Sequence, residues 1–138
     1  PSNPGLKATW YDFKGKTCAE IAAAPVKNTY RVEDVTIPRG VKSYIIGLTY
    51  KGYINIPEDG IYSFYLSSDD GSMLYIDGKQ VIDNDGLHAP GEVTGQAALK
   101  QGYHPIEVQY FDHGGGSINL KVCDNNGKEM PFTYLYAH

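Results

Sequence analysis

The chain has 138 residues, with 12 Lys and Arg against 16 Asp and Glu, and a formal net charge of −4. This length suits one domain with its own apolar core, while scattered basic residues disfavour a nucleic-acid partner. Because no run approaches the roughly 20 apolar residues of a membrane-spanning helix, and no charged-then-apolar leader precedes Pro1, we expect one domain over residues 1–138, cut from a longer protein, without a membrane span.

The first part of the chain predicts one strand and one short helix. The run "LKATWYDF" from Leu6 alternates as a strand does, and "TCAEIAAAP" then has the pattern of a helix. Thr17 is a suitable N-cap, Glu20 follows at the spacing of a capping box, and Pro25 ends the pattern.

The rest of the chain predicts a succession of short strands. With 12 Tyr and 16 Gly the composition favours strands and turns over helices. Regular spacing of such runs is typical of an all-β fold, and we expect an antiparallel β-sandwich or barrel. The predicted strands cover residues 43–56, 60–68, 72–77, 79–83, 91–100, 103–111, 117–124 and 131–137.

Two of these runs predict core faces, and two turn signals separate strands. Alternate residues of a strand share a face. Asp77-Gly78 predicts a tight hairpin and "PEDG" at 57–60 another turn. The expected core residues are Tyr62, Phe64 and Leu66 on one strand and Ile106, Val108 and Tyr110 on another.

Cys18 and Cys123 lie far apart in the sequence and form no CxxC pair. They could close one disulfide across a long loop or remain two buried thiols. We expect the thiols to be free.

Two stretches of the chain resemble the PA14 domain family. They are "INIPEDGIYSFYLSSDDGSMLYIDGKQVIDNDG" at 54–86 and "LKQGYHPIEVQYFDHGGGSINLKV" at 99–122. The resemblance implies an antiparallel β-sandwich that serves as an accessory module of secreted or surface glycosidases, adhesins and toxins. It also implies a secreted, periplasmic or cell-surface location, with the catalytic domain of a parent glycoside hydrolase as neighbour.

Asp69 and Asp70 adjoin each other directly after an apolar strand. Neighbouring strand residues point to opposite faces, so the pair meets at one site only if the backbone departs from that pattern, and a cis peptide bond would allow it. Oxygen-preferring Ca²⁺ would explain the pair. In lectin-like members of the family the matching pair adopts this cis geometry, and the resemblance implies a calcium site. The alternative is that both residues cap the turn in "SDDGS".

Further calcium ligands are expected from the loop "FDHGGGS". By resemblance, Asp112 stands where lectin-type members carry a side-chain ligand, and flexible glycines could turn carbonyls inward, which makes Gly114 and Gly116 candidates. The chain departs from the flocculin pattern here, since Asp replaces Asn and glycine replaces an apolar or aromatic residue. Metal binding is compatible with this change, whereas sugar specificity is expected to differ.

Polar residues beside the acidic pair are candidates for hydrogen bonds to a sugar. Asn84, Asp85 and His88 lie in or after "DNDG", and His113 adjoins the expected ion. The alternative for the "DNDG" segment is a solvated turn. Exposed aromatic rings can also stack on sugars, but for Tyr65 and Tyr75 half-buried packing is the favoured interpretation.

We therefore expect a carbohydrate-binding accessory module, with calcium as a possible cofactor and a glycan or polysaccharide as partner. The alternative is a structural domain that packs against a neighbouring catalytic domain and binds no ligand. An enzyme is not expected, because adjacent Asp69 and Asp70 are badly placed for glycoside hydrolysis, which needs carboxylates facing each other across a cleft.

Overall fold

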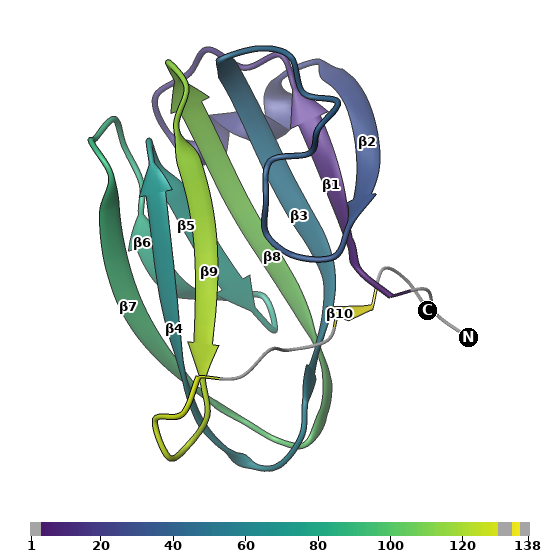
Figure 1. Ribbon diagram of the computed structural model, residues 1–138, viewed down its shortest axis with the longest axis vertical. Coiled ribbons are helices and arrows are strands. Elements are labelled where there is room, and N and C mark those ends of the chain that lie inside the picture. The colour runs from purple at the N-terminus through teal and green to yellow at the C-terminus, as the bar shows by residue number, and fades with distance from the viewer. Residues whose placement is uncertain (1–3, 130–133, 136–138) are drawn as a thin grey trace.

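A computed structural model describes residues 4–129 and 134–135 and shows a sandwich of two antiparallel sheets (Figure 1). The larger sheet has the order β2-β1-β3-β8-β5-β6, with β10 pairing β3, and the smaller has the order β7-β4-β9. The predicted β-sandwich is confirmed. The elements are β1 (Leu6–Tyr11), a 3-10 helix η1 (Cys18–Ala23), β2 (Val26–Val32), β3 (Ile45–Ile56), β4 (Gly60–Asp69), β5 (Ser72–Ile76), β6 (Lys79–Asn84), β7 (Gly91–Leu99), β8 (Gly102–His113), β9 (Ser117–Cys123) and β10 (Tyr134–Leu135).

The N-terminal part differs from expectation in two elements. Strand β2, which no sequence pattern predicted, pairs antiparallel with β1. It lies at the edge of the larger sheet and most of its residues are exposed, so it lacks the apolar alternation that marks a half-buried strand. The expected helix is present only as the short 3-10 helix η1, where Glu20 Oε1 accepts hydrogen bonds from the backbone nitrogen of Thr17 at 3.1 Å and its hydroxyl at 2.8 Å.

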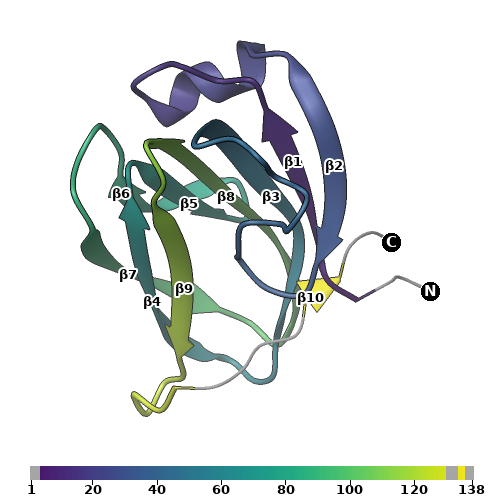
Figure 2. The same cartoon turned by 45° about the horizontal axis from the view of Figure 1, so that its top comes forward.

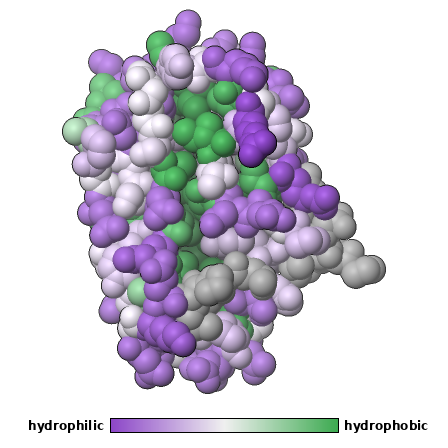
Figure 3. All heavy atoms as spheres, viewed as in Figure 1, coloured by the Kyte–Doolittle hydropathy of each residue, from purple (hydrophilic) through white to green (hydrophobic). Residues whose placement is uncertain are grey.

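The core lies between the two sheets. The predicted core residues of β4 and β8 are all buried, none with more than 3% of its surface exposed. Burial of these side chains removes apolar area from water and fixes the register of both strands. Apolar side chains also reach the surface between β9 and the loop before β3, in the upper part of the face in Figure 3.

The two cysteines form no disulfide. Both Cys18 and Cys123 are buried free thiols, as expected. Burial is the main cause that raises the pKa of the Cys18 thiol, and the neighbouring Asp85 raises it further. Cys18 therefore belongs to the structural interior.

Connections between strands lie at the two ends of the sandwich. The predicted hairpin joins β5 and β6, with Asp77 at φ 55° and Gly78 at φ 75°. At the opposite end, β4 finishes at Asp69 and β8 at His113. Figure 2 brings this end forward and shows the β4–β5 and β8–β9 connections next to each other.

Candidate metal centre

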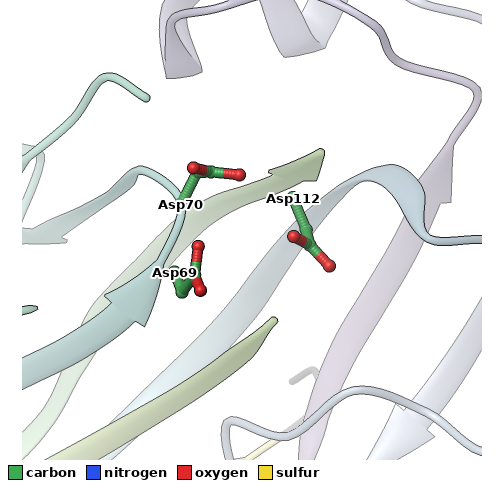
Figure 4. Close-up of side chains that lie close together, drawn as sticks. All are labelled: Asp69, Asp70 and Asp112. Atoms are coloured by element: carbon green, nitrogen blue, oxygen red, sulfur yellow. The ribbon is translucent and has the colours of Figure 1, made fainter. Parts of the chain in front are cut away.

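Three carboxylates gather where the ends of β4 and β8 meet. Asp69 ends β4, Asp70 follows it, and Asp112 lies in β8, so the group joins the two sheets (Figure 4). One oxygen from each carboxylate lies within 4.8 Å of the others, and in the described part of the chain this is the one His, Cys, Asp and Glu group with such convergence. The bond between Asp69 and Asp70 is cis, as the resemblance implied.

Asp112 is held by the glycine loop that follows it. The side chain is 3% exposed. Its Oδ1 accepts a hydrogen bond from the amide of Gly114 at 3.2 Å, and its Oδ2 accepts from Gly115 at 2.9 Å and Gly116 at 2.6 Å. The described contacts therefore use glycine N–H groups, and a ligand role for the Gly114 and Gly116 carbonyls stays a prediction.

Position 116 requires glycine because the backbone there lies close to the backbone of Asp69. A Cβ placed on this residue would lie 2.0 Å from the carbonyl oxygen of Asp69, a distance that two nonbonded atoms cannot adopt. A Cβ on Gly114 would meet no atom within 4 Å. The loop thus needs glycine at position 116 for the start of β9 to pass the acidic pair.

Asp70 is oriented by the β6–β7 loop and by the end of β8. Its Oδ1 accepts from the amide of His88 at 3.1 Å, and its Oδ2 accepts from the amide of His113 at 2.9 Å. The hydroxyl of Ser68 donates to the Asp70 carbonyl at 2.7 Å. These contacts fix the carboxylate at the edge of the site and leave each oxygen further lone pairs for another partner.

The site concentrates negative charge without an ion-paired partner among the described residues. Burial is the main cause that raises the pKa of Asp69 above its ordinary range, and the charges of Asp70 and Asp112 raise it further. Within residues 4–129 and 134–135, no Lys or Arg nitrogen lies within ion-pair distance of the three carboxylates. Like charges held this close repel one another.

His88 supplies the nearest compensating group. Its Nδ1 lies 2.7 Å from the Ala89 carbonyl oxygen and its Nε2 lies 2.8 Å from that of Asn84. Burial lowers the pKa of His88, but these two bonds and the charges of Asp70 and Asp69 raise it more, so the net shift is upward. Because both oxygens accept, the arrangement suits a doubly protonated ring.

This donor set suits a hard divalent cation. All three side chains offer oxygen, the atom that Ca²⁺ prefers, and the ion takes about six to eight oxygen ligands. The amide donors orient Asp70 and Asp112 toward a shared space without using all their lone pairs. The residues present therefore fit a calcium ion that also keeps positions for oxygens from outside the chain.

Asn84, predicted as a sugar contact, has its side-chain amide bonded within the fold, and a sugar contact by this residue stays a prediction. Asn84 is 8% exposed, and its Nδ2 donates to the carbonyl of Leu66 at 3.3 Å, the hydroxyl of Ser68 at 3.3 Å and the carbonyl of Gly91 at 3.1 Å. The side chain is therefore directed into the fold, where it ties β6 to β4 and β7.

The other residues predicted to bind sugar make hydrogen bonds within the protein. Asp85 Oδ1 accepts from the Cys18 amide at 2.9 Å and the Gly86 amide at 2.8 Å. Both ring nitrogens of His88 are engaged as described above, and His113 Nε2 lies 2.7 Å from the carbonyl oxygen of Gly15. These residues position the loops around the cluster, and a direct sugar contact by Asp85, His88 or His113 stays a prediction.

The aromatic residues near the site divide into two kinds. Tyr65 and Tyr75 are half-buried, as favoured, and Lys121 Nζ lies 4.6 Å from the Tyr65 ring centre. Tyr110 was expected only in the core, but its hydroxyl also donates to the Asp69 carbonyl at 2.8 Å. The sequence analysis gave no site role to Tyr44, which is 73% exposed next to the glycine loop. Tyr44 carried no signal beyond its place in a predicted strand.

The chain matches the family model described as the PA14 domain over residues 2–134. It is 36% identical over 77 residues to a beta-hexosaminidase of Porphyromonas gingivalis, a match that covers 55% of this chain and 9% of that protein. It is 41% identical over 68 residues to an alpha-agarase of Thalassotalea agarivorans, covering 49% of this chain and 4% of that protein. The matched region is thus a small part of both relatives.

Solved structures share the fold at low sequence identity. A PA14 sugar-binding domain from an RTX adhesin superposes with a TM-score of 0.81 at 18% identity, covering 98% of this chain and 99% of that one. The epithelial adhesin 6 A domain of Candida glabrata, solved with Galb1-3GlcNAc, gives 0.70 at 11% identity, covering 100% and 88%. Across the described residues, no helix has the length and apolar character to cross a membrane.

Proposed function

This chain belongs to the PA14 domain family, and on that premise we propose that it is a glycan-binding module whose acidic cluster holds calcium. The observation that carries the proposal is the convergence of Asp69, Asp70 and Asp112 from two sheets, without a Lys or Arg partner among the described residues. The sugar-binding domain of the RTX adhesin, which has the same fold, supports the glycan as ligand class.

The chain's own residues would hold and present the ion. Asp69, Asp70 and Asp112 supply the charged oxygens, with the Gly114 and Gly116 carbonyls as further candidate ligands. A bound calcium supplies open coordination positions that two neighbouring sugar hydroxyls can fill in place of water. The amides of His88 and His113 keep Asp70 in place, and the three glycine amides keep Asp112 in place.

The site suits weak, reversible binding. It lies at the exposed end of a sandwich, where Gly114 and Gly115 are exposed and offer no side chain. We expect a dissociation constant near a millimolar, or roughly −4 kcal/mol. In a longer protein such as the glycosidase relatives, tethering would raise the effective concentration of a catalytic domain at its polysaccharide.

We propose binding without catalysis. The three carboxylates crowd around one point, whereas glycoside hydrolysis uses two carboxyl groups about 5 to 9.5 Å apart on opposite sides of the bond.

A calcium titration tests the proposal. Isothermal calorimetry should show one calcium per chain for the natural sequence and a loss of that heat in Asp69→Ala, which removes one of the three carboxylate ligands. Glu58→Gln is the matched control, because Glu58 is an exposed acid in the β3–β4 turn at the other end. No heat and no calcium-dependent rise in melting temperature for the natural chain would favour the alternative, a structural domain without a ligand.

A further inference from the structure

Tyr44 lies beside the candidate centre although it belongs to a distant part of the sequence. It immediately precedes β3 and is 73% exposed. A Cβ placed on Gly115 would lie 3.4 Å from Cδ1 of the Tyr44 ring, so the ring flanks the glycine loop. The amide of that same Gly115 donates to Asp112 Oδ2 at 2.9 Å. One residue thus separates the ring from a carboxylate of the cluster.

The backbone around Tyr44 is held in place. The hydroxyl of Ser43 accepts from the amide of Ile45 at 3.2 Å and lies 3.3 Å from the Ile45 carbonyl oxygen. Ile45 pairs with His113 across β3 and β8, which ties the segment to the strand that carries Asp112. The position of Tyr44 relative to the cluster is therefore set by the sheet.

The surroundings leave the ring uncovered. A Cβ at Gly114 would meet no atom within 4 Å, so the loop adds no side chain beside the ring or the cluster. Ile45 is also 42% exposed, so apolar surface continues along the start of β3. An exposed aromatic ring next to a group of carboxylates offers an apolar contact and an ion contact side by side.

We propose that Tyr44 is the stacking platform for the sugar, and that the ligand class is a hexopyranoside. The apolar C–H face of the ring would lie on Tyr44, while two adjacent hydroxyls would reach the acidic cluster. This inference rests on the proposed function and adds a specificity-determining residue to it. The tyrosine would select pyranosides with an uninterrupted C–H face next to a vicinal diol, and would reject open-chain polyols.

The test separates the platform from the ion site. Calcium-saturated protein is titrated with methyl α-D-galactopyranoside, methyl α-D-mannopyranoside and methyl β-D-glucopyranoside, with sorbitol as the open-chain comparison. For any bound pyranoside, Tyr44→Ala should weaken binding about tenfold, and Tyr44→Phe should change it by less than about threefold. Tyr103→Ala is the matched control, since Tyr103 is 50% exposed at the start of β8, the other end of that strand, and it should have no effect.

Two further readouts do not depend on affinity for sugar. Calcium affinity should be the same in the natural chain, Tyr44→Ala and Tyr103→Ala. In proton NMR spectra, the C–H protons of one pyranoside face should shift upfield on binding through the ring current of a stacked aromatic, and this shift should vanish in Tyr44→Ala.

The outcomes are distinguishable. Unchanged pyranoside affinity and an unchanged upfield shift in Tyr44→Ala would overturn the platform and leave the proposed function standing. Equal affinity for sorbitol would overturn the ligand class. If the calcium-loaded natural chain binds none of the three pyranosides, the proposed glycan function fails, and the platform fails with it.

Discussion

The two ends of the sandwich treat aspartate in opposite ways. At the hairpin end, Asp77 pairs with His104, with 2.9 Å between Asp77 Oδ2 and His104 Nδ1. At the other end, Asp69, Asp70 and Asp112 converge, and no Lys or Arg within the described residues pairs with them. The chain gives the first carboxylate an ion-pair partner, whereas the second group has no Lys, Arg or His side-chain nitrogen within ion-pair distance among the described residues. The difference distinguishes a structural ion pair from the group of carboxylates that we propose as a ligand site.

The largest expected effect comes from blocking the glycine loop. Gly116→Ala places a Cβ where the Asp69 carbonyl oxygen lies, so the loop must move and both the fold and the cluster should suffer. We expect a loss of about 3 kcal/mol in the free energy of unfolding, measured by urea denaturation, together with loss of calcium binding. Gly114→Ala is the control, because that position is open. Equal stability of the two variants would contradict the close approach.

The next effect concerns stabilisation by the ion. At a calcium concentration of about 100 times its dissociation constant, the natural chain should gain about 2.7 kcal/mol in the free energy of unfolding. Asp69→Ala should lose most of this gain, as measured by denaturation with calcium and with EDTA. An Asp77→Asn variant should keep the gain, since Asp77 already has a partner in the chain. A calcium response retained by Asp69→Ala would remove Asp69 from the site.

Without calcium, removing an aspartate charge should change the free energy of unfolding in opposite directions at the two ends. Asp69→Asn removes one of three repelling charges and should raise the free energy of unfolding in EDTA by less than about 1 kcal/mol after solvent screening, because burial and then the charges of Asp70 and Asp112 raise the pKa of Asp69. Asp77→Asn removes the partner of His104 and should lower it by a few tenths of a kcal/mol. Chemical denaturation at neutral pH gives both values, and a loss of stability in Asp69→Asn would contradict the repulsion.

The smallest effect is a pH dependence at the hairpin end. Burial lowers the pKa of His104, but the bond to the Lys100 carbonyl and the Asp77 carboxylate raise it more, so the net shift is upward from 6.5. A raised folded-state pKa means that the stabilisation is fully present below about pH 6.5 and is lost as the pH rises through the folded pKa. We expect a loss below about 1 kcal/mol, because the pair is partly exposed.

Comparison with Asp77→Asn isolates this pH effect. The stability difference between the natural chain and the variant, measured by denaturation from pH 5.5 to 9, should shrink toward high pH. A difference that grows with rising pH would contradict the assigned protonation.

The strands and the acidic pair were predictable for different reasons. Strands β4 and β8 bury alternate residues, so their pattern is visible in the sequence, while β2 at the sheet edge exposes most of its side chains and leaves no such pattern. Asp69 and Asp70 were predicted to share a site because two adjacent carboxylates after a strand are not explained by strand geometry. Asp112 was predicted from the family resemblance.

What sequence reasoning missed depends on contacts between distant segments. Asn84 stands in a turn-like sequence, but its side chain points inward to Ser68 and Gly91. His113 Nε2 reaches the Gly15 carbonyl across 98 residues of sequence. Tyr44 is brought beside Gly115 by the pairing of β3 with β8. Such neighbours follow from the topology, which local patterns do not specify.

The most direct test of the central claim is a crystal structure grown with calcium, with anomalous diffraction measured at a wavelength where calcium scatters anomalously. The account predicts one anomalous peak between Asp69, Asp70 and Asp112, with oxygen ligands at about 2.3 to 2.6 Å. Carboxylates in the same arrangement around a position with no anomalous signal, at millimolar calcium, would contradict it.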